Sequence, residues 1–186
     1  MNRHREMTTM GVHVVAFVVL LALAVLPREV MAQDVGLPIG EKATPVVLED
    51  LDGNAVDLGE IIGTRPVVVE FWATWCPLCE ALGPEFEAAH ERFGDRVAFI
   101  TIAVAVGQTR RAVRRHLDRH PVPGTVLWDT DGRATRAFQA PTTSYVVILD
   151  ADGRVAYTGV GEDQEIAEAL ERLTGDPENR APKTEN

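Results

Sequence analysis

Uninterrupted apolar runs divide the chain and predict the strands of a central sheet. Residues 67–72, 97–104 and 144–149 are almost entirely apolar and rich in valine, isoleucine and aromatic side chains. A run of this kind indicates a strand that is buried on both faces, as in the interior of an α/β sheet. A shorter apolar run at 125–128 predicts a fourth strand.

Two Asp-Gly pairs predict tight turns between further strands. Asp52-Gly53 separates short strands expected at 45–48 and 55–58, and Asp152-Gly153 leads into a strand expected at 155–158. An Asp-Gly pair between two β-rich runs is a strong hairpin signal. We therefore expect an N-terminal β-hairpin and an antiparallel pair of strands near the C-terminus.

Apolar positions three and four residues apart predict helices between these strands. Helices are expected at 76–93, 108–119 and 162–173. The first places one apolar stripe on a single face, made of Leu78, Leu82, Phe86, Ala89 and Phe93. Because a strand, a helix and a second strand in this order form a parallel pair, the pattern predicts one α/β domain.

The first 32 residues have the pattern of an export segment. Arg3 and Arg5 precede the apolar stretch 11–26, and Ala32 ends a stretch suited to cleavage by signal peptidase. The apolar stretch also approaches the roughly 20 residues that cross a bilayer, so an uncleaved anchor is the alternative. Either interpretation places the domain outside the cytoplasm, in the periplasm or another extracytoplasmic space, because the arginines stay inside.

Composition and charge limit the partners. The hydrophobic content of 46% in 186 residues supplies the core of one domain, and the formal charge of -10 argues against nucleic acid, which needs a basic face. We expect membrane contact only through the N-terminal segment, if it is uncleaved. The expected regions are the signal peptide or anchor 1–32, a linker 33–42, the domain 43–173 and a disordered tail 174–186.

The two cysteines, Cys76 and Cys79, lie where the strand 67–72 gives way to the helix 76–93. A helix N-terminus stabilises a thiolate, and in such motifs the thiol pKa falls to roughly 3.5–7.5. Cys76 is then the attacking nucleophile, and Cys79 is the resolving thiol that attacks a mixed disulfide. The alternatives are a structural disulfide, which would stabilise little over so short a loop, and zinc, which needs two further ligands.

The stretch Phe71-Trp72-Ala73-Thr74-Trp75-Cys76-Pro77-Leu78-Cys79, with Pro84 in the next helix and Pro141-Thr142-Thr143 before a strand, resembles the thioredoxin superfamily. The resemblance is greatest to exported thiol-disulfide oxidoreductases of the TlpA and ResA type. It covers about residues 40–173. It implies a thioredoxin-like fold, with a central mixed sheet, flanking helices and an N-terminal β-hairpin, a redox-active disulfide and no cofactor or metal.

The same resemblance implies a surface that binds the partner protein. In this superfamily a cis-proline lies beside the disulfide and the adjoining backbone pairs with an extended partner segment, which points to Ala140 and Pro141. Trp75 is expected to shield the thiols and to contribute to docking. Pro77 is expected on the same surface, and its place directly after Cys76 leaves the redox potential open.

Glu70 is the one charged residue in the strand 67–72. The superfamily carries a buried carboxylate at this place, below the second cysteine. A buried carboxyl group has a raised pKa and can take the proton from Cys79 during resolution. The alternative is a charge at the sheet edge that reaches solvent, because alternate strand residues face opposite sides.

These features predict an extracytoplasmic enzyme that exchanges a Cys76–Cys79 dithiol or disulfide with partner proteins. The resemblance favours a protein-disulfide reductase that receives electrons from a membrane thiol donor. Its substrates would be proteins that carry a disulfide or a dithiol. The alternatives are a protein that handles copper(I) through the two thiolates, and a binding module without catalysis.

Overall fold

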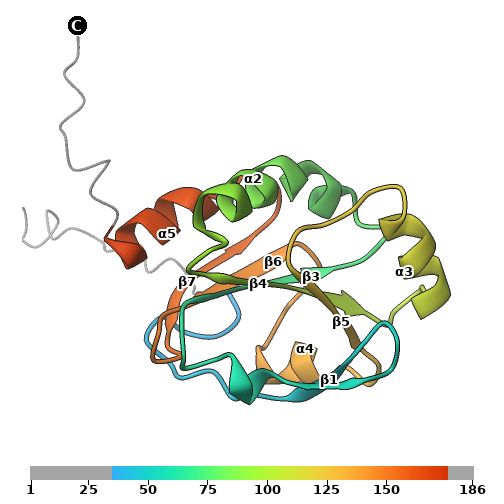
Figure 1. The fold of residues 1–186 in the computed structure, drawn as a ribbon, viewed down its shortest axis with the longest axis horizontal. Coiled ribbons are helices and arrows are strands. Elements are labelled where there is room, and N and C mark those ends of the chain that lie inside the picture. Colours follow the sequence, from blue (N-terminus) through green and yellow to red (C-terminus); the bar gives the residue numbers. More distant parts are fainter. Residues whose placement is uncertain (1–34, 176–186) are drawn as a thin grey trace, which may run out of the picture. The chain divides into compact units, whose positions relative to one another are not determined.

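A computed structural model describes residues 35–175, which form a seven-stranded mixed sheet with helices on both faces (Figure 1). The strand order is β2-β1-β5-β4-β3-β6-β7. The strands are β1 (Val47–Asp50), β2 (Ala55–Asp57), β3 (Val67–Trp72), β4 (Ala98–Val104), β5 (Thr125–Asp129), β6 (Tyr145–Leu149) and β7 (Val155–Val160). The predicted α/β fold with a central mixed sheet is confirmed, as is the N-terminal hairpin of β1 and β2.

The central strand β3 is parallel to β4 and antiparallel to β6. All six of its residues are buried, as its apolar sequence predicts. Its register pairs Glu70 with Thr101 of β4 and with Val146 of β6, and it pairs Phe71 with Tyr145. This register decides which residue of the β6 segment lies beside the end of β3.

Helices cover the two faces of the sheet unequally. They are α2 (Pro77–Phe93), α3 (Arg110–Leu117), α4 (Arg133–Ala137), α5 (Ile166–Thr174) and the short 3-10 helix η1 (Leu58–Glu60). In Figure 1, α2 and α5 lie on one face and α4 lies on the other. The apolar face of α2 packs on the sheet through Leu82, Phe86, Ala89 and Phe93 as predicted, but Leu78, also expected on this face, is 42% exposed.

The helix α5 begins four residues later than predicted. Gln164 is buried, and its side chain donates hydrogen bonds to the carbonyls of Ser144 and Gly161. Because these bonds hold the segment before Ile166 against the start of β6, the segment forms an irregular loop instead of a first helical turn.

The compact domain starts before Ala43, within the segment expected to be a linker. The side chain of Leu37 is 2% exposed and its N–H donates to the Tyr145 hydroxyl, and the Gly40 N–H donates to the Val155 carbonyl at 2.7 Å. Gly36 has a φ of 83°, and an added Cβ would lie 2.2 Å from the Tyr145 hydroxyl, so only glycine fits there. These residues are part of the folded unit.

Within residues 35–175, no helix is both long and apolar enough to cross a bilayer. The predicted export segment 1–32 and almost all of the predicted tail 174–186 lie outside the described residues.

Candidate functional site

The chain turns sharply between β3 and α2, and this turn carries both cysteines. β3 ends at Trp72, and the Cys76 N–H donates to the Ala73 carbonyl at 3.1 Å, which closes the turn. Cys76 is the N-cap residue of α2, and Pro77 is its first helical residue. Proline suits this position because its fixed φ matches the helix and its missing N–H would have no helical partner.

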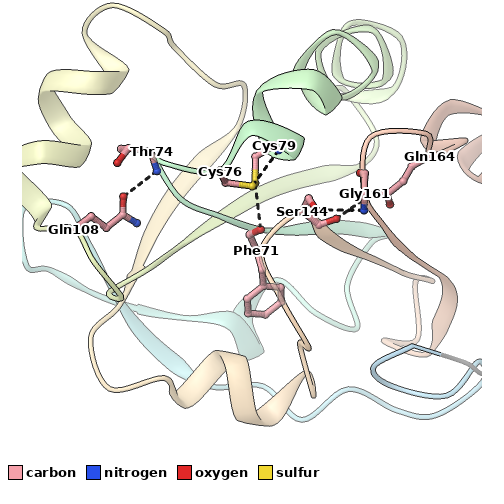
Figure 2. The surroundings of a disulfide bond; sticks show 8 residues. All are labelled: Phe71, Thr74, Cys76, Cys79, Gln108, Ser144, Gly161 and Gln164. Atoms are coloured by element: carbon pink, nitrogen blue, oxygen red, sulfur yellow. Dashed lines mark hydrogen bonds between the residues drawn. A yellow bond between two sulfur atoms is a disulfide. The ribbon is translucent and has the colours of Figure 1, made fainter.

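Cys76 and Cys79 form a disulfide bond, with their Cα atoms 5.3 Å apart. The Sγ of Cys76 accepts a hydrogen bond from the Cys79 N–H at 3.1 Å, as the capping oxygen does in an ordinary helix (Figure 2). When the disulfide opens, this N–H and the positive end of the helix dipole stabilise a thiolate on Cys76. The two cysteines are thus inequivalent, with Cys76 suited to be the nucleophile.

Trp75 is held beside the disulfide by a loop that follows β4. Its side chain is 49% exposed, and its Nε1–H donates to the Val106 carbonyl at 2.9 Å. Gln108 fixes the same turn, since its Oε1 accepts from the Thr74 N–H at 2.9 Å (Figure 2). The exposed indole and the neighbouring Val106, which is 70% exposed, form an apolar rim next to the cysteines.

Glu70 is buried in β3, so the alternative of a solvent-reaching edge charge is wrong. It is 3% exposed and lies on the face of the sheet that α2 covers, between Val68 and Trp72. Burial raises the pKa of its carboxyl group to about 8, because the ionised form loses hydration without a compensating charge. At neutral pH most of these carboxyl groups carry a proton.

Thr101 is a polar neighbour of Glu70 that the sequence analysis did not single out. It is fully buried in β4, and the register places it beside Glu70 on the same face. Neither its Oγ1 nor Oε1 of Glu70 has a hydrogen-bond partner among residues 35–175. A single threonine in an apolar run does not stand out in the sequence. Thr101 becomes notable only because strand pairing places it beside Glu70 of β3.

The prediction that Pro141 is a cis-proline beside the disulfide is wrong. Every peptide bond within residues 35–175 is trans. Pro141 is exposed, and Ala140 packs instead against the core cluster on the opposite face of the sheet. Three residues separate Pro141 from the start of β6, and this offset moves it away from the end of β3.

Ser144 lies in the place expected for that proline. It directly precedes Tyr145, the register partner of Phe71, and its N–H donates to the Phe71 carbonyl at 2.8 Å. The Sγ of Cys79 lies 4.0 Å from the same carbonyl oxygen (Figure 2). A proline at position 144 would have no N–H, so it could not form the hydrogen bond that Ser144 donates to the Phe71 carbonyl.

A cleft of about 690 Å³ opens beside the disulfide, between α2 and the C-terminal end of α3. Cys76 and Cys79 both line it. Its α2 wall carries Glu80 and Glu87, and its other wall carries three basic side chains, those of His116, Arg119 and His120. Burial lowers the pKa of His116, with further lowering by His120 and Arg119, and its ring packs 5.3 Å from the Trp72 ring.

The site thus combines most of the predicted residues and leaves two apart. Cys76, Cys79, Trp75 and Pro77 line one cleft, and Glu70 is buried in β3, two residues before Trp72, which also lines the cleft. Ala140 and Pro141 are not among the residues that line this cleft. Among residues 35–175 no group of three histidine, cysteine or acidic side chains is placed to hold a metal ion.

Comparisons with known proteins agree with this geometry. The profile of the Redoxin family matches residues 38–173. The thiol-disulfide oxidoreductase ResA of Halalkalibacterium halodurans is 28% identical over 136 residues, covering 72% of this chain and 76% of that protein. ResA of Bacillus subtilis is 28% identical over 122 residues, covering 66% and 67%.

Among solved structures, a putative thiol:disulfide interchange protein DsbE from Chlorobium tepidum has the same fold. Its TM-score is 0.64 at 24% identity, and the match covers 74% of this chain and 96% of that one. The sheet order, the disulfide at the start of α2 and the family match over most of the domain lead to one conclusion. The chain belongs to the Redoxin family and is a TlpA/ResA-like member of the thioredoxin superfamily.

Proposed function

We propose that this thiol-disulfide oxidoreductase reduces disulfide bonds of partner proteins in an extracytoplasmic compartment. The observation that carries the proposal is the disulfide at the N-terminus of α2, whose first sulfur is the helix cap and borders an open cleft. A structural disulfide needs no such access to partners. The export pattern of residues 1–32 supports the location.

The reaction begins from the reduced protein. The Cys76 thiolate attacks one sulfur of the partner disulfide, which forms a mixed disulfide and releases the other partner sulfur as a thiolate. Cys79 then loses its proton and attacks the Sγ of Cys76, which breaks the mixed disulfide and forms the Cys76–Cys79 bond. This protein loses two electrons and the Cys79 proton, and the partner gains the two electrons; its two thiolates take up that proton and one from solvent.

Glu70 is suited to move the proton of Cys79. In its ionised form it accepts that proton during resolution, and in its protonated form it returns the proton when the disulfide is reduced again. Because its pKa is about 8, the protonated form dominates at neutral pH and favours the second of these steps. A membrane thiol donor that re-reduces the disulfide would use this step.

The cleft supports a polypeptide partner. Trp75 gives the cleft an exposed apolar surface, and the walls of the cleft carry acidic side chains on α2 and basic ones near the end of α3. An extended segment of the partner protein, on either side of the partner's cysteine, could contact the apolar surface, the acidic side chains and the basic side chains.

Insulin reduction with dithiothreitol tests the activity, and two matched variants separate the roles of the cysteines. We expect Cys76→Ser to abolish the acceleration that the unaltered protein gives. Cys79→Ser should instead accumulate a mixed disulfide with the substrate, visible on a non-reducing gel, because the resolving sulfur is absent. Full turnover by Cys76→Ser would refute the proposal.

The direction of transfer is tested by the reduction potential of the Cys76–Cys79 pair. A value near the roughly -270 mV of thioredoxin supports a reductant, whereas one near about -120 mV would mean an oxidant.

Export is tested by fusing residues 1–35 to alkaline phosphatase, which is active only outside the cytoplasm. An inactive but stable fusion would exclude the proposed location.

A further inference from the structure

A buried hydrogen-bond network connects the loop before α5 to Ser144, the residue directly before β6. Gln164 is 7% exposed, and its Nε2 donates to the Ser144 carbonyl at 2.9 Å and to the Gly161 carbonyl at 2.7 Å (Figure 2). The Gly161 N–H donates to both the carbonyl and the Oγ of Ser144, each at 3.2 Å. Gly159 makes room for this arrangement, since a Cβ there would lie 2.5 Å from Oε1 of Gln164.

The network ends at the cysteine pair. Ser144 is fully buried and has a φ of 58°, a left-handed conformation that costs free energy for a residue with a side chain. In this conformation its N–H donates to the Phe71 carbonyl at 2.8 Å, and the Sγ of Cys79 lies 4.0 Å from that oxygen. The Ser144 carbonyl on the other side is the atom that Gln164 and Gly161 bind.

We propose that Ser144 and Gln164 are positioning residues that fix the Phe71 carbonyl as the hydrogen-bond acceptor of the reduced Cys79 thiol, and so stabilise the dithiol form. This inference rests on the proposed redox function of the Cys76–Cys79 pair. It adds two residues that set the equilibrium between the dithiol and the disulfide. Gln164 lies 85 positions after Cys79 in the sequence and acts on the thiol of Cys79 through the backbone of Ser144.

The chemistry of the two redox states gives the proposal its direction. In the disulfide, Cys79 has no S–H and cannot donate to Phe71. Reduction adds two electrons and two protons, and the new S–H of Cys79 can donate to the carbonyl beside it. A carbonyl oxygen has two lone pairs, so it can accept from Ser144 and Cys79 together. The bond exists only in the reduced protein and only with a protonated Cys79.

Loosening the network should therefore favour the disulfide. Gln164→Met keeps the length and the burial of the side chain but removes both N–H donors. We expect the equilibrium constant for reduction by glutathione to fall about tenfold, which corresponds to a potential about 30 mV more negative. The thiolate absorbance of Cys79, measured in reduced Cys76→Ser protein, should rise at a lower pH in the Gln164 variant.

Two further variants serve as controls. Tyr157→Phe removes the hydroxyl that donates to Oε1 of Gln164 at 3.4 Å but keeps both Nε2 bonds of Gln164, and it should leave the equilibrium within about twofold of the unaltered protein. Ser144→Gly keeps the N–H and accepts a positive φ, so it should also stay within about twofold. A large change in Ser144→Gly would show that the hydroxyl acts directly, and would overturn the backbone route.

An unchanged equilibrium and an unchanged Cys79 titration in Gln164→Met would also overturn the proposal. Thermal melts of each oxidised variant show that the domain is folded, and Gln164→Leu, which also lacks both N–H donors, replaces Gln164→Met in the same two measurements if that variant does not fold. The measurement uses glutathione and no protein partner. A failure to reduce insulin would count against the proposed function, while the effect of Gln164 on the equilibrium would stand separately.

Discussion

Glu70 shows how one buried side chain links stability to the chemistry of the site. Its carboxyl group lies in the central strand, without a hydrogen-bond partner for Oε1 among the described residues. Leaving such a group buried costs free energy, and the cost is greatest for the ionised form. A structural residue at this position would be apolar, as its neighbours are, so the carboxyl group is retained at a cost to stability.

The pKa of Glu70 predicts how that cost depends on pH. The folded protein holds a proton up to about pH 8, whereas the unfolded chain releases it near 4.5. The folded state therefore binds more protons across this window, and stability falls as pH rises, by up to about 1.4 kcal/mol per pH unit. We expect Glu70→Gln to remove this slope and to be more stable than the unaltered protein at pH 8, measured by urea denaturation of the oxidised form.

Glu87→Gln, an exposed change on α2, is the matched control and should keep the slope.

The same Glu70 variant tests the proton transfer. It should slow the release of a mixed disulfide more than its formation, in rapid-mixing experiments with a disulfide substrate. Equal slowing of both steps, or an unchanged pH slope, would contradict the role given to Glu70.

At the scale of the elements, α2 does more than present the cysteines. It also supplies the N-terminal cap of α5, because Glu165, the residue in the cap position, makes no side-chain cap bond. Glu85 of α2 accepts the Ala167 N–H at 2.9 Å instead. The helix with the disulfide thus orders the start of α5, which directly follows the Gln164 loop.

Removing this contact should weaken the packing of the two helices. We expect Glu85→Ala to destabilise the domain by about 1–2 kcal/mol, because it leaves a partly buried N–H without its charged acceptor. Glu87→Ala, two residues along the same helix and exposed, should change stability by less than about 0.5 kcal/mol. Chemical denaturation of both variants measures the difference, and similar values for the two would argue against the cap.

At the scale of the whole molecule, the segment before β1 closes the face of the sheet opposite the disulfide. Leu37 joins the core cluster that contains Phe71, Phe138 and Tyr145. Phe71 belongs both to this cluster and, through its carbonyl, to the cysteine site. The early segment therefore supports the strand end on which the site is built.

Truncating Leu37 should destabilise the entire domain. Leu37→Ala removes a buried side chain, and we expect a loss of about 2–5 kcal/mol in the free energy of unfolding. Ile39→Ala, two residues later and 52% exposed, should cost less than about 0.5 kcal/mol. A Leu37 variant as stable as the Ile39 variant would mean that the segment is only loosely attached.

The sequence by itself determined the fold and the reactive pair. The apolar runs of β3, β4 and β6 and the spacing in α2 are local patterns, and each formed the element that it predicts. The cysteines at a strand-to-helix junction are likewise local, since the N-cap and first-turn positions follow from three neighbouring residues. Chemistry that depends on near neighbours can be read from the chain alone.

Only the tertiary structure decided what lies around that pair. The register of β6 against β3 places Ser144 beside Cys79 and leaves Pro141 three residues away from that place. Burial of Glu70, the contribution of Leu37 and the bonds of Gln164 depend on segments that are distant in sequence. A shift of one residue in strand pairing would move each side chain to the other face. Because β3 and β6 are buried on both faces, their apolar sequences do not distinguish one register from the next.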